Sequence, residues 1–161
     1  MSMFNPLNLK IDHVHLNVSN LEKSLQFYRS ILGFSIARKN HKTALLSTSI
    51  DDNNSESFLV ALSESDEEGL STARNRQKAG MYHFAILLPG RKFLSLFLRH
   101  LREKLDPEYY GGMADHGVSE SIYIHDPDFN GIEVYTDRSP LKWKWANGRV
   151  QMITEPLDTG N

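Results

Sequence analysis

The chain carries the same order of hydrophobic and polar positions twice. The first copy opens with strict alternation over residues 11–18, which predicts a β-strand with one buried face. Hydrophobic residues at helical spacing follow over residues 21–32, between a Ser19-Asn20 turn that offers a helix N-cap and Gly33, a residue typical of helix ends. Three further strands are then predicted, over residues 34–38, 43–48 and 57–63.

The second copy begins after a polar stretch, residues 64–80, which we interpret as a linker between two halves. Its first strand is predicted over residues 83–88 and its helix over residues 91–105. Six hydrophobic residues of this helix are expected to face inward: Phe93, Leu94, Phe97, Leu98, Leu101 and Leu105. The remainder predicts a glycine-rich loop at 110–113, a strand at 121–125, a turn at 126–130 and a last strand at 130–135.

Each half is therefore predicted to be a strand, a helix and two or three more strands, which indicates an internal duplication. His13 and His83 open the first strand of each half, 70 residues apart. Two such copies, each with a curved sheet, would turn their concave faces toward a shared cavity. The sequence predicts a single α+β domain, with module one at about 10–63, module two at about 81–138 and a C-terminal tail at 139–161.

Composition and charge exclude several classes of protein. The 161 residues are 40% hydrophobic and 24% charged, as in an ordinary globular domain. The formal net charge is −2 and no basic stripe or polybasic run is present, which argues against nucleic acid and membrane surfaces as partners. Because the chain has no cysteine, it has no disulfide and no thiolate ligand. Met1 to Asn8 lacks the features of a signal peptide, so we expect a cytoplasmic protein. The expected partner is a small-molecule substrate.

Three residues on separate predicted strands form a candidate metal site. His13, His83 and Glu133 supply two imidazoles and one carboxylate, the facial ligand set of non-haem iron oxygenases, which leaves open positions on the metal. Burying Glu133 without a cation would cost several kcal/mol. The alternative interpretation is that these are half-exposed strand histidines and a surface glutamate. Strand alternation places His15 on the same face as His13, and Tyr135 on the same face as Glu133.

Several motifs resemble the vicinal oxygen chelate superfamily, which includes glyoxalases, bleomycin-resistance proteins and extradiol dioxygenases. The resemblance covers roughly residues 10–138 and rests on His13-Val14-His15-Leu16-Asn17-Val18 and on Asp126-Pro127-Asp128-Phe129-Asn130-Gly131-Ile132-Glu133. Residues 82–89 and 115–121 are similar to the N-terminal half of bacterial catechol-2,3-dioxygenase-like proteins. The resemblance implies two βαβββ modules that form a curved mixed sheet around a central cavity, with metal ligands at His13, His83 and Glu133.

The resemblance also implies roles for residues around the metal. A divalent metal is expected, with iron(II) the first choice and manganese, nickel or zinc also accepted by such ligands. Tyr123, ten residues before Glu133, matches a tyrosine that binds substrate in extradiol enzymes, and His116 would act as an acid or base. Residues 67–73 lack the catalytic histidine of those enzymes, so His15 is assigned to proton transfer instead. Phe129 replaces a turn glycine, and Asn130-Gly131 is expected to supply the left-handed residue.

The leading functional hypothesis is a metal-dependent enzyme most like an extradiol ring-cleaving dioxygenase. A glyoxalase I-like isomerase would need a fourth ligand near Ala61, where only Glu56 is a weak substitute. A thiol transferase of the fosfomycin-resistance kind would need a cluster of anion-binding residues after Glu133, where the chain has Tyr135 and Arg138. The remaining alternative is a metal-free protein that binds an aromatic ligand between Tyr123, Tyr135 and a tryptophan, Trp143 or Trp145, unless the tryptophans anchor the tail.

Two questions of assembly stay open at the level of sequence. The similar dioxygenases continue into a second domain of the same kind, so the chain is either a single-domain paralogue or lacks a catalytic half. A homodimer is compatible with the sequence, because sheet edges and the aromatic residues of the tail would need partners.

Overall fold

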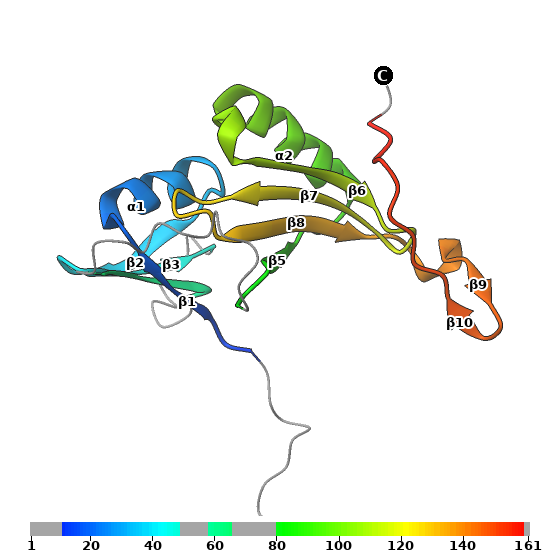
Figure 1. Ribbon diagram of the computed structural model, residues 1–161, viewed down its shortest axis with the longest axis horizontal. Helices are drawn as coiled ribbons and strands as arrows, with labels where there is room; N and C mark the ends of the chain where they lie inside the picture. Colours follow the sequence, from blue (N-terminus) through cyan, green and yellow to red (C-terminus); the bar gives the residue numbers. More distant parts are fainter. Residues whose placement is uncertain (1–10, 49–57, 66–79, 160–161) are drawn as a thin grey trace, which may run out of the picture.

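The computed structural model describes residues 11–48, 58–65 and 80–159, which form two four-stranded sheets with one helix on the same side of each (Figure 1). Module one contains β1 (Val14–Val18), α1 (Leu21–Ser30), β2 (Ser35–Lys39), β3 (Thr43–Ser47) and β4 (Val60–Glu64). Module two contains β5 (Phe84–Leu87), α2 (Arg91–Lys104), β6 (Tyr110–Asp115), β7 (Ser119–His125) and β8 (Gly131–Asp137). The predicted α+β fold of two βαβββ modules is confirmed.

The two sheets have the same topology, as the duplication predicted. Their strand orders are β1-β4-β3-β2 and β5-β8-β7-β6, so the first strand of each module pairs with its last. That pairing is parallel in both sheets, with Val14 beside Val60 and Phe84 beside Ile132, and the other pairings are antiparallel. A parallel pair needs a crossover connection, and each helix provides the start of one. The helix therefore lies against one face of its sheet and leaves the other face for a site.

Local sequence signals explain where α1 begins and ends. The Asn20 side chain accepts a hydrogen bond from the Lys23 amide at 2.8 Å, which satisfies one of the free N–H groups of the first turn. Gly33 follows the helix with a φ of +73°, a conformation that costs glycine little. Both assignments agree with the sequence prediction.

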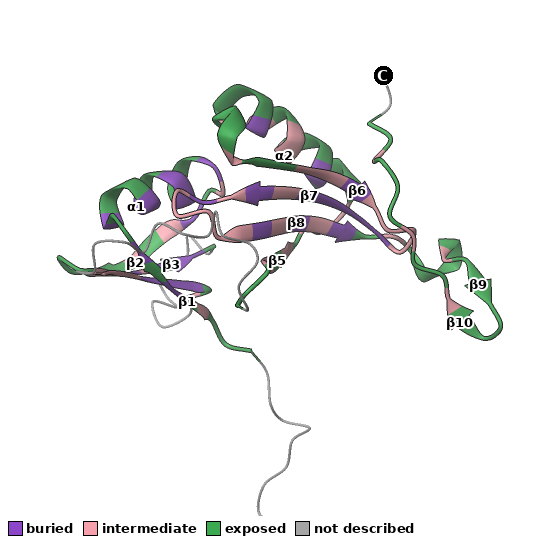
Figure 2. Cartoon of the chain, viewed as in Figure 1, coloured by how far each residue is buried: buried purple, intermediate pink, exposed green. Residues whose placement is uncertain are grey.

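The hydrophobic core lies between the two helices and the faces of the sheets beneath them, and Figure 2 shows buried residues of α1 and α2 on their inner sides. One cluster spans both modules, so they share a core. A buried hydrogen bond also joins them, because the Tyr28 hydroxyl of α1 donates to Asp126 Oδ2 at 3.0 Å with both residues fully buried. Nearby, the Ser19 amide donates to the Asp128 carboxylate. The turn after β7 is therefore fixed against module one.

Three sequence predictions about local structure are wrong. The glycine-rich segment at 110–113 is part of strand β6, which pairs with β7 and has a register shift between Tyr110 and Gly112. A bulged edge strand tolerates glycine, and the glycines were misread as a loop.

Phe93, expected inside, is 48% exposed. The two residues of α2 that are buried, Leu94 and Leu101, lie seven positions apart on a narrow face that leaves Phe93 at its edge.

The third wrong prediction concerns the turn before β8. Phe129 itself adopts the left-handed conformation, with a φ of +62°, in place of Asn130 or Gly131. Asp126 holds this turn, because Oδ1 accepts from the amides of Asp128 and Asn130 and Oδ2 accepts from the Asn130 side chain. Gly131 is required for a different reason, since a Cβ there would lie 2.4 Å from the Tyr82 carbonyl oxygen.

The C-terminal tail is ordered beyond module two. A short 3-10 helix at Pro140–Lys142 leads into a hairpin of β9 (Trp145–Ala146) and β10 (Arg149–Val150), which projects from the end of the sheet in Figure 1. The chain then returns along module two to residue 159. The predicted linker falls largely outside the described residues, so the module boundaries stay predictions. No helix in the described ranges has the length and apolar character to cross a membrane.

Candidate metal centre

His83 and Glu133 meet on the face of module two that is turned away from α2. Strands β5 and β8 are parallel neighbours, with Ala85 beside Glu133, and His83 directly precedes β5. The His83 Nε2 atom lies 3.0 Å from Glu133 Oε2. Their side chains are 28% and 14% exposed, so the pair is partly shielded from water yet accessible from one side. Two of the three predicted ligands are thus adjacent.

Two hydroxyl groups hold the Glu133 carboxylate from the neighbouring strand. Tyr123 of β7 lies directly opposite Glu133, and its hydroxyl is 3.0 Å from Oε1. Ser121, two residues earlier on the same face, donates to the same oxygen at 2.6 Å. Oε1 is therefore held by the protein, while Oε2 faces His83. This arrangement gives the carboxylate a fixed orientation, with Oε2 turned toward His83 Nε2.

His116 extends this hydrogen-bonded group toward the tail. Its Nε2 atom lies 2.8 Å from the Tyr123 hydroxyl, and its Nδ1 atom lies 3.1 Å from the Ile153 carbonyl oxygen. The pKa of Tyr123 is raised above its ordinary value, first by burial and then by the adjacent Glu133 carboxylate. The phenol consequently keeps its proton at neutral pH and is available as a hydrogen-bond donor.

His13 and His15 lie on module one and make other contacts. The exposed His13 ring has its Nδ1 atom 2.8 Å from Asp12 Oδ2 and its centroid 4.6 Å from that of Phe58. His15 Nε2 lies 2.8 Å from the Ser63 hydroxyl on β4. Within the ranges that the structure describes, no group of three His, Asp or Glu side chains is close enough to bind one metal ion. The structure brings together His83, Glu133, Tyr123 and His116, and the assignment of His13 as third ligand stays a prediction.

The His83–Glu133 pair fits two adjacent positions on a divalent ion. His83 Nε2 and Glu133 Oε2 lie 3.0 Å apart, so both atoms would be available to one ion bound beside them. An imidazole nitrogen and a carboxylate oxygen are also the donor types that iron, manganese and zinc accept. His83 Nδ1 is buried and makes no hydrogen bond in the described structure, so the contact with Glu133 leaves this side chain incompletely satisfied.

Sequence reasoning missed two contributions to the site. Ser121 shares a face with Tyr123 by simple strand alternation, so the sequence did contain a signal for it. The Ile153 carbonyl comes from the tail, and a main-chain contact of this kind leaves no signal in the residue type. The tryptophans do not approach the site: Trp143 donates to the Arg138 carbonyl at 3.0 Å, and Trp145 is 60% exposed. Trp143 therefore anchors the tail, which was the alternative interpretation.

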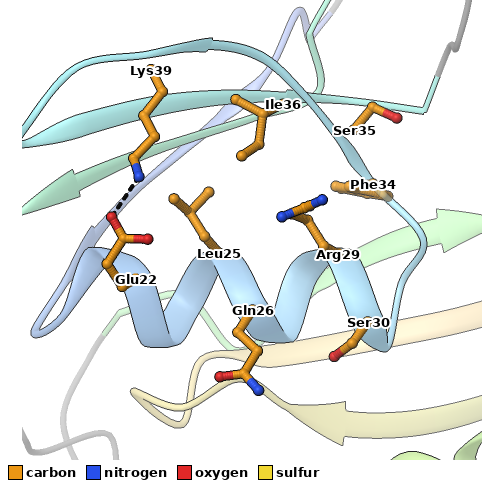
Figure 3. Close-up of a pocket in the computed structure, with 9 residues that line it drawn as sticks. All are labelled: Glu22, Leu25, Gln26, Arg29, Ser30, Phe34, Ser35, Ile36 and Lys39. Carbon is orange, nitrogen blue, oxygen red and sulfur yellow. Dashed lines mark hydrogen bonds and ion pairs between the residues drawn. The ribbon is translucent and has the colours of Figure 1, made fainter.

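Two surface hollows lie on the helix side of the sheets. Figure 3 shows one of about 670 Å³ between α1 and β2, where Leu25, Arg29 and Ile36 surround the space and Lys39 pairs with Glu22 at one end. The other, of about 240 Å³, lies between α2 and the end of the tail. Neither hollow includes any of the predicted site residues.

Comparison with known proteins gives consistent matches. The family described as Glyoxalase/Bleomycin resistance protein/Dioxygenase superfamily matches residues 10–134. The chain is similar to a curated Bacillus subtilis (strain 168) protein named catechol-2,3-dioxygenase, with 37% identity over 152 residues, which is 92% of this chain and 49% of that protein. The chain thus spans about half the length of this relative.

Solved structures with the same fold have lower sequence identity. A glyoxylase/bleomycin resistance protein/dioxygenase domain from Frankia sp. EAN1pec has a TM-score of 0.64 at 17% identity, covering 82% of this chain and 94% of that one. Lactoylglutathione lyase from Agrobacterium tumefaciens has a TM-score of 0.58 at 20% identity, covering 82% and 96%. A fosfomycin resistance protein from Listeria monocytogenes has a TM-score of 0.57 at 15% identity, covering 81% and 94%.

Proposed function

The chain belongs to the glyoxalase/bleomycin resistance protein/dioxygenase superfamily, and from this we propose that it is a metal-dependent enzyme most like an extradiol ring-cleaving dioxygenase. Its substrate would be a small molecule with two vicinal oxygen atoms, such as a catechol. The observation that carries the proposal is the His83–Glu133 pair, whose carboxylate is also bound by Ser121 and Tyr123. The 37% identity to catechol-2,3-dioxygenase supports the reaction class rather than any particular substrate.

We propose that His83, Glu133 and His13 hold the metal, with iron(II) preferred over manganese, nickel or zinc. When bound, such an ion would lower the pKa of a vicinal diol and bring it together with dioxygen. His13 lies at the start of an edge strand, β1, as His83 does at the start of β5. Because no three such side chains of the described residues are close enough to share an ion, His13 would have to move toward the His83–Glu133 pair when the ion binds.

The other residues would act on the substrate and its protons. The Tyr123 hydroxyl, kept protonated by its raised pKa, would donate a hydrogen bond to a substrate oxygen. His116, in contact with that hydroxyl, would accept or return a proton. His15 is proposed to assist proton transfer from module one, where its Nε2 now contacts Ser63.

The related reactions have weaker support from the structure. An isomerase of the glyoxalase I kind would need a ligand near position 61, but Ala61 is buried at 5% exposure beside His15 in the β1–β4 pair. A thiol transferase would need a free cation near Glu133, but Arg138 is already paired with Asp115 and Glu120. A metal-free binding protein is the second candidate, because the described residues hold two metal donors together and not three.

Location and assembly are further proposals. We propose a cytoplasmic protein, in keeping with the absence of cysteine. We also propose self-association through the exposed residues of the tail, where Leu141 is 97% and Trp145 60% exposed.

Anaerobic reconstitution followed by assay tests the reaction. The protein is loaded with iron(II), freed of excess metal and mixed with several catechols in oxygenated buffer, and a yellow ring-fission product is expected. His83→Ala should abolish the colour. The control His41→Ala, which removes an exposed histidine from the turn between β2 and β3, should retain it. Metal that stays bound without any product would refute ring cleavage and favour an isomerase. Failure to retain metal would favour the binding protein.

A further inference from the structure

The last part of the tail, residues 151–158, runs beside module two as an additional extended segment, here called the strap. Asp115 and Glu155 exchange two main-chain hydrogen bonds, of 2.8 and 3.0 Å, and the Ile153 amide donates to the His116 carbonyl at 3.2 Å. The strap therefore pairs with the last residue of β6, Asp115, and with His116 in the turn that follows it. In Figure 1 it lies along the end of β6.

The strap is also fixed at its far end. Arg91 donates through Nη2 to the Asp158 carbonyl at 2.8 Å, and through Nε to Glu120 Oε2 at 2.7 Å. The Glu120 side chain is 5% exposed and is bound by Arg138 as well, so Arg91 itself has a firm partner. Leu157 packs against the hydrophobic core. The strap is thus attached at both ends of its course over module two.

Close packing brings the strap directly onto the His116 turn. Gly117 has a φ of +75°, and a Cβ there would lie 3.3 Å from Ile153 Cγ1 and 3.6 Å from the Gln151 carbonyl oxygen. A glycine therefore permits both the turn and the close approach of the strap. The consequence is that the Ile153 carbonyl reaches the His116 ring.

This contact determines which nitrogen of a neutral His116 ring carries the proton. A carbonyl oxygen accepts hydrogen bonds and cannot donate, so a hydrogen bond between Nδ1 and the Ile153 oxygen, 3.1 Å away, requires a hydrogen on Nδ1. The Thr154 hydroxyl, which can accept as well as donate, lies farther from the same nitrogen, at 3.4 Å. A neutral imidazole has one N–H group, which leaves Nε2 with a free lone pair. That lone pair faces the Tyr123 hydroxyl at 2.8 Å, so Nε2 and Glu133 Oε1, 3.0 Å from the same hydroxyl, are alternative acceptors for its single hydrogen.

We propose that the strap, through the Ile153 carbonyl, holds neutral His116 as the Nδ1-protonated tautomer and thereby makes Nε2 the base that faces Tyr123. This inference rests on the proposed function for its consequence, since His116 matters to catalysis only if the enzyme performs the proposed chemistry. Ile153 is a positioning residue, because its hydrogen bonds within the described structure go to His116 and to none of the three proposed metal ligands, so that it acts only through the His116 ring.

The tautomer can be measured without metal or substrate. Nitrogen-15 NMR of the histidine rings is recorded on the intact metal-free protein at about pH 9, above the range in which histidine ordinarily titrates. The His116 signals are identified by their loss in His116→Gln. The wild-type ring should show a protonated Nδ1 and an unprotonated Nε2, and an Nε2-protonated ring would overturn the proposal.

Two proline variants test the role of the strap. Ile153→Pro removes the amide that donates to His116 and places ring atoms against that carbonyl, so the strap should separate and the ring should shift toward the Nε2-protonated form. Met152→Pro is the matched control, because Met152 is 69% exposed and its amide makes no hydrogen bond within the described tail. It should keep the wild-type tautomer. An unchanged ring in folded Ile153→Pro would refute the role of the strap, and if that variant does not fold, the wild-type spectrum alone decides.

The outcomes for the strap and for the proposed function are separable. An active iron enzyme with an Nε2-protonated His116 would refute only the proposed effect of the strap on the His116 tautomer. A protein with the expected tautomer that neither retains metal nor cleaves catechols would refute the proposed function and leave the strap assignment standing. If both hold, Ile153→Pro should lower kcat and change the pH profile of kcat/KM, and Met152→Pro should do neither.

Discussion

Glu133 and Tyr123 face each other directly across strands β8 and β7, and the Tyr123 hydroxyl lies 3.0 Å from Glu133 Oε1. This relationship places a neutral phenol beside a proposed metal ligand and connects that ligand to His116. Because the two residues are a register pair in the sheet, backbone pairing fixes their separation. The site thus depends on sheet geometry more than on loop conformation.

Removing the hydroxyl of either Tyr123 or Ser121 should weaken metal binding. Tyr123→Phe and Ser121→Ala each take one hydrogen bond from Oε1, so the carboxylate is less firmly oriented. Loss of such a partner typically lowers metal affinity or activity by about 10- to 100-fold. Titration with manganese(II), followed by electron paramagnetic resonance, measures the affinity. Tyr123→Phe should in addition lower kcat more than Ser121→Ala does, and equal kcat values would remove Tyr123 from the reaction.

A methyl group at Gly131 should disturb the start of β8. A Cβ there would lie 2.4 Å from the Tyr82 carbonyl oxygen and 3.1 Å from the His83 Cβ. The two strands would therefore have to separate beside the His83–Glu133 pair. Gly131→Ala is expected to lower the free energy of unfolding by about 1–3 kcal/mol, as overpacking usually does. Gly80→Ala is the control, since a Cβ there meets no atom within 4 Å. Equal urea midpoints for the two variants would contradict the prediction.

Stability should depend on pH through Asp126. Burial raises the pKa of this carboxyl above its ordinary value of 3.8, although hydrogen bonds from Asn130 and Tyr28 oppose the shift. Between 3.8 and the raised pKa the folded protein binds more protons than the unfolded chain, so this group's contribution to the free energy of unfolding falls as pH rises. Asp126→Asn lacks this titration. The stability of the wild type relative to Asp126→Asn should therefore fall as pH rises through that window, and a difference independent of pH would refute the assignment.

Much of the fold could be predicted because periodicity and capping are local signals. The repeat of His13 and His83 and the alternation of β1 and β8 predicted both modules, and Asn20 and Gly33 marked the ends of α1 correctly. Glycine in β6 misled the prediction, because the same residue type serves turns and bulged strands. The left-handed turn residue was also misplaced, since the main-chain contacts of Asp126 determine which residue takes that conformation.

The candidate site could be predicted only within one sheet. Glu133, Tyr123 and His83 lie on neighbouring strands of module two, and strand register is enough to bring them together. His13 belongs to the other sheet, and its distance from them depends on how the two modules pack, which no local pattern encodes. The contact of Ile153 with His116 was not predicted because it uses a main-chain carbonyl of the tail.

The amount of iron that the protein retains tests the central claim most directly. Protein loaded anaerobically with iron(II) and desalted is analysed by mass spectrometry for metal per chain, beside Glu133→Gln and the control His41→Ala. Wild type and His41→Ala should each retain about one ion per chain, and Glu133→Gln should retain almost none. Wild-type protein that retains no metal, or a Glu133→Gln variant that retains as much as wild type, would contradict a metal site at His83 and Glu133.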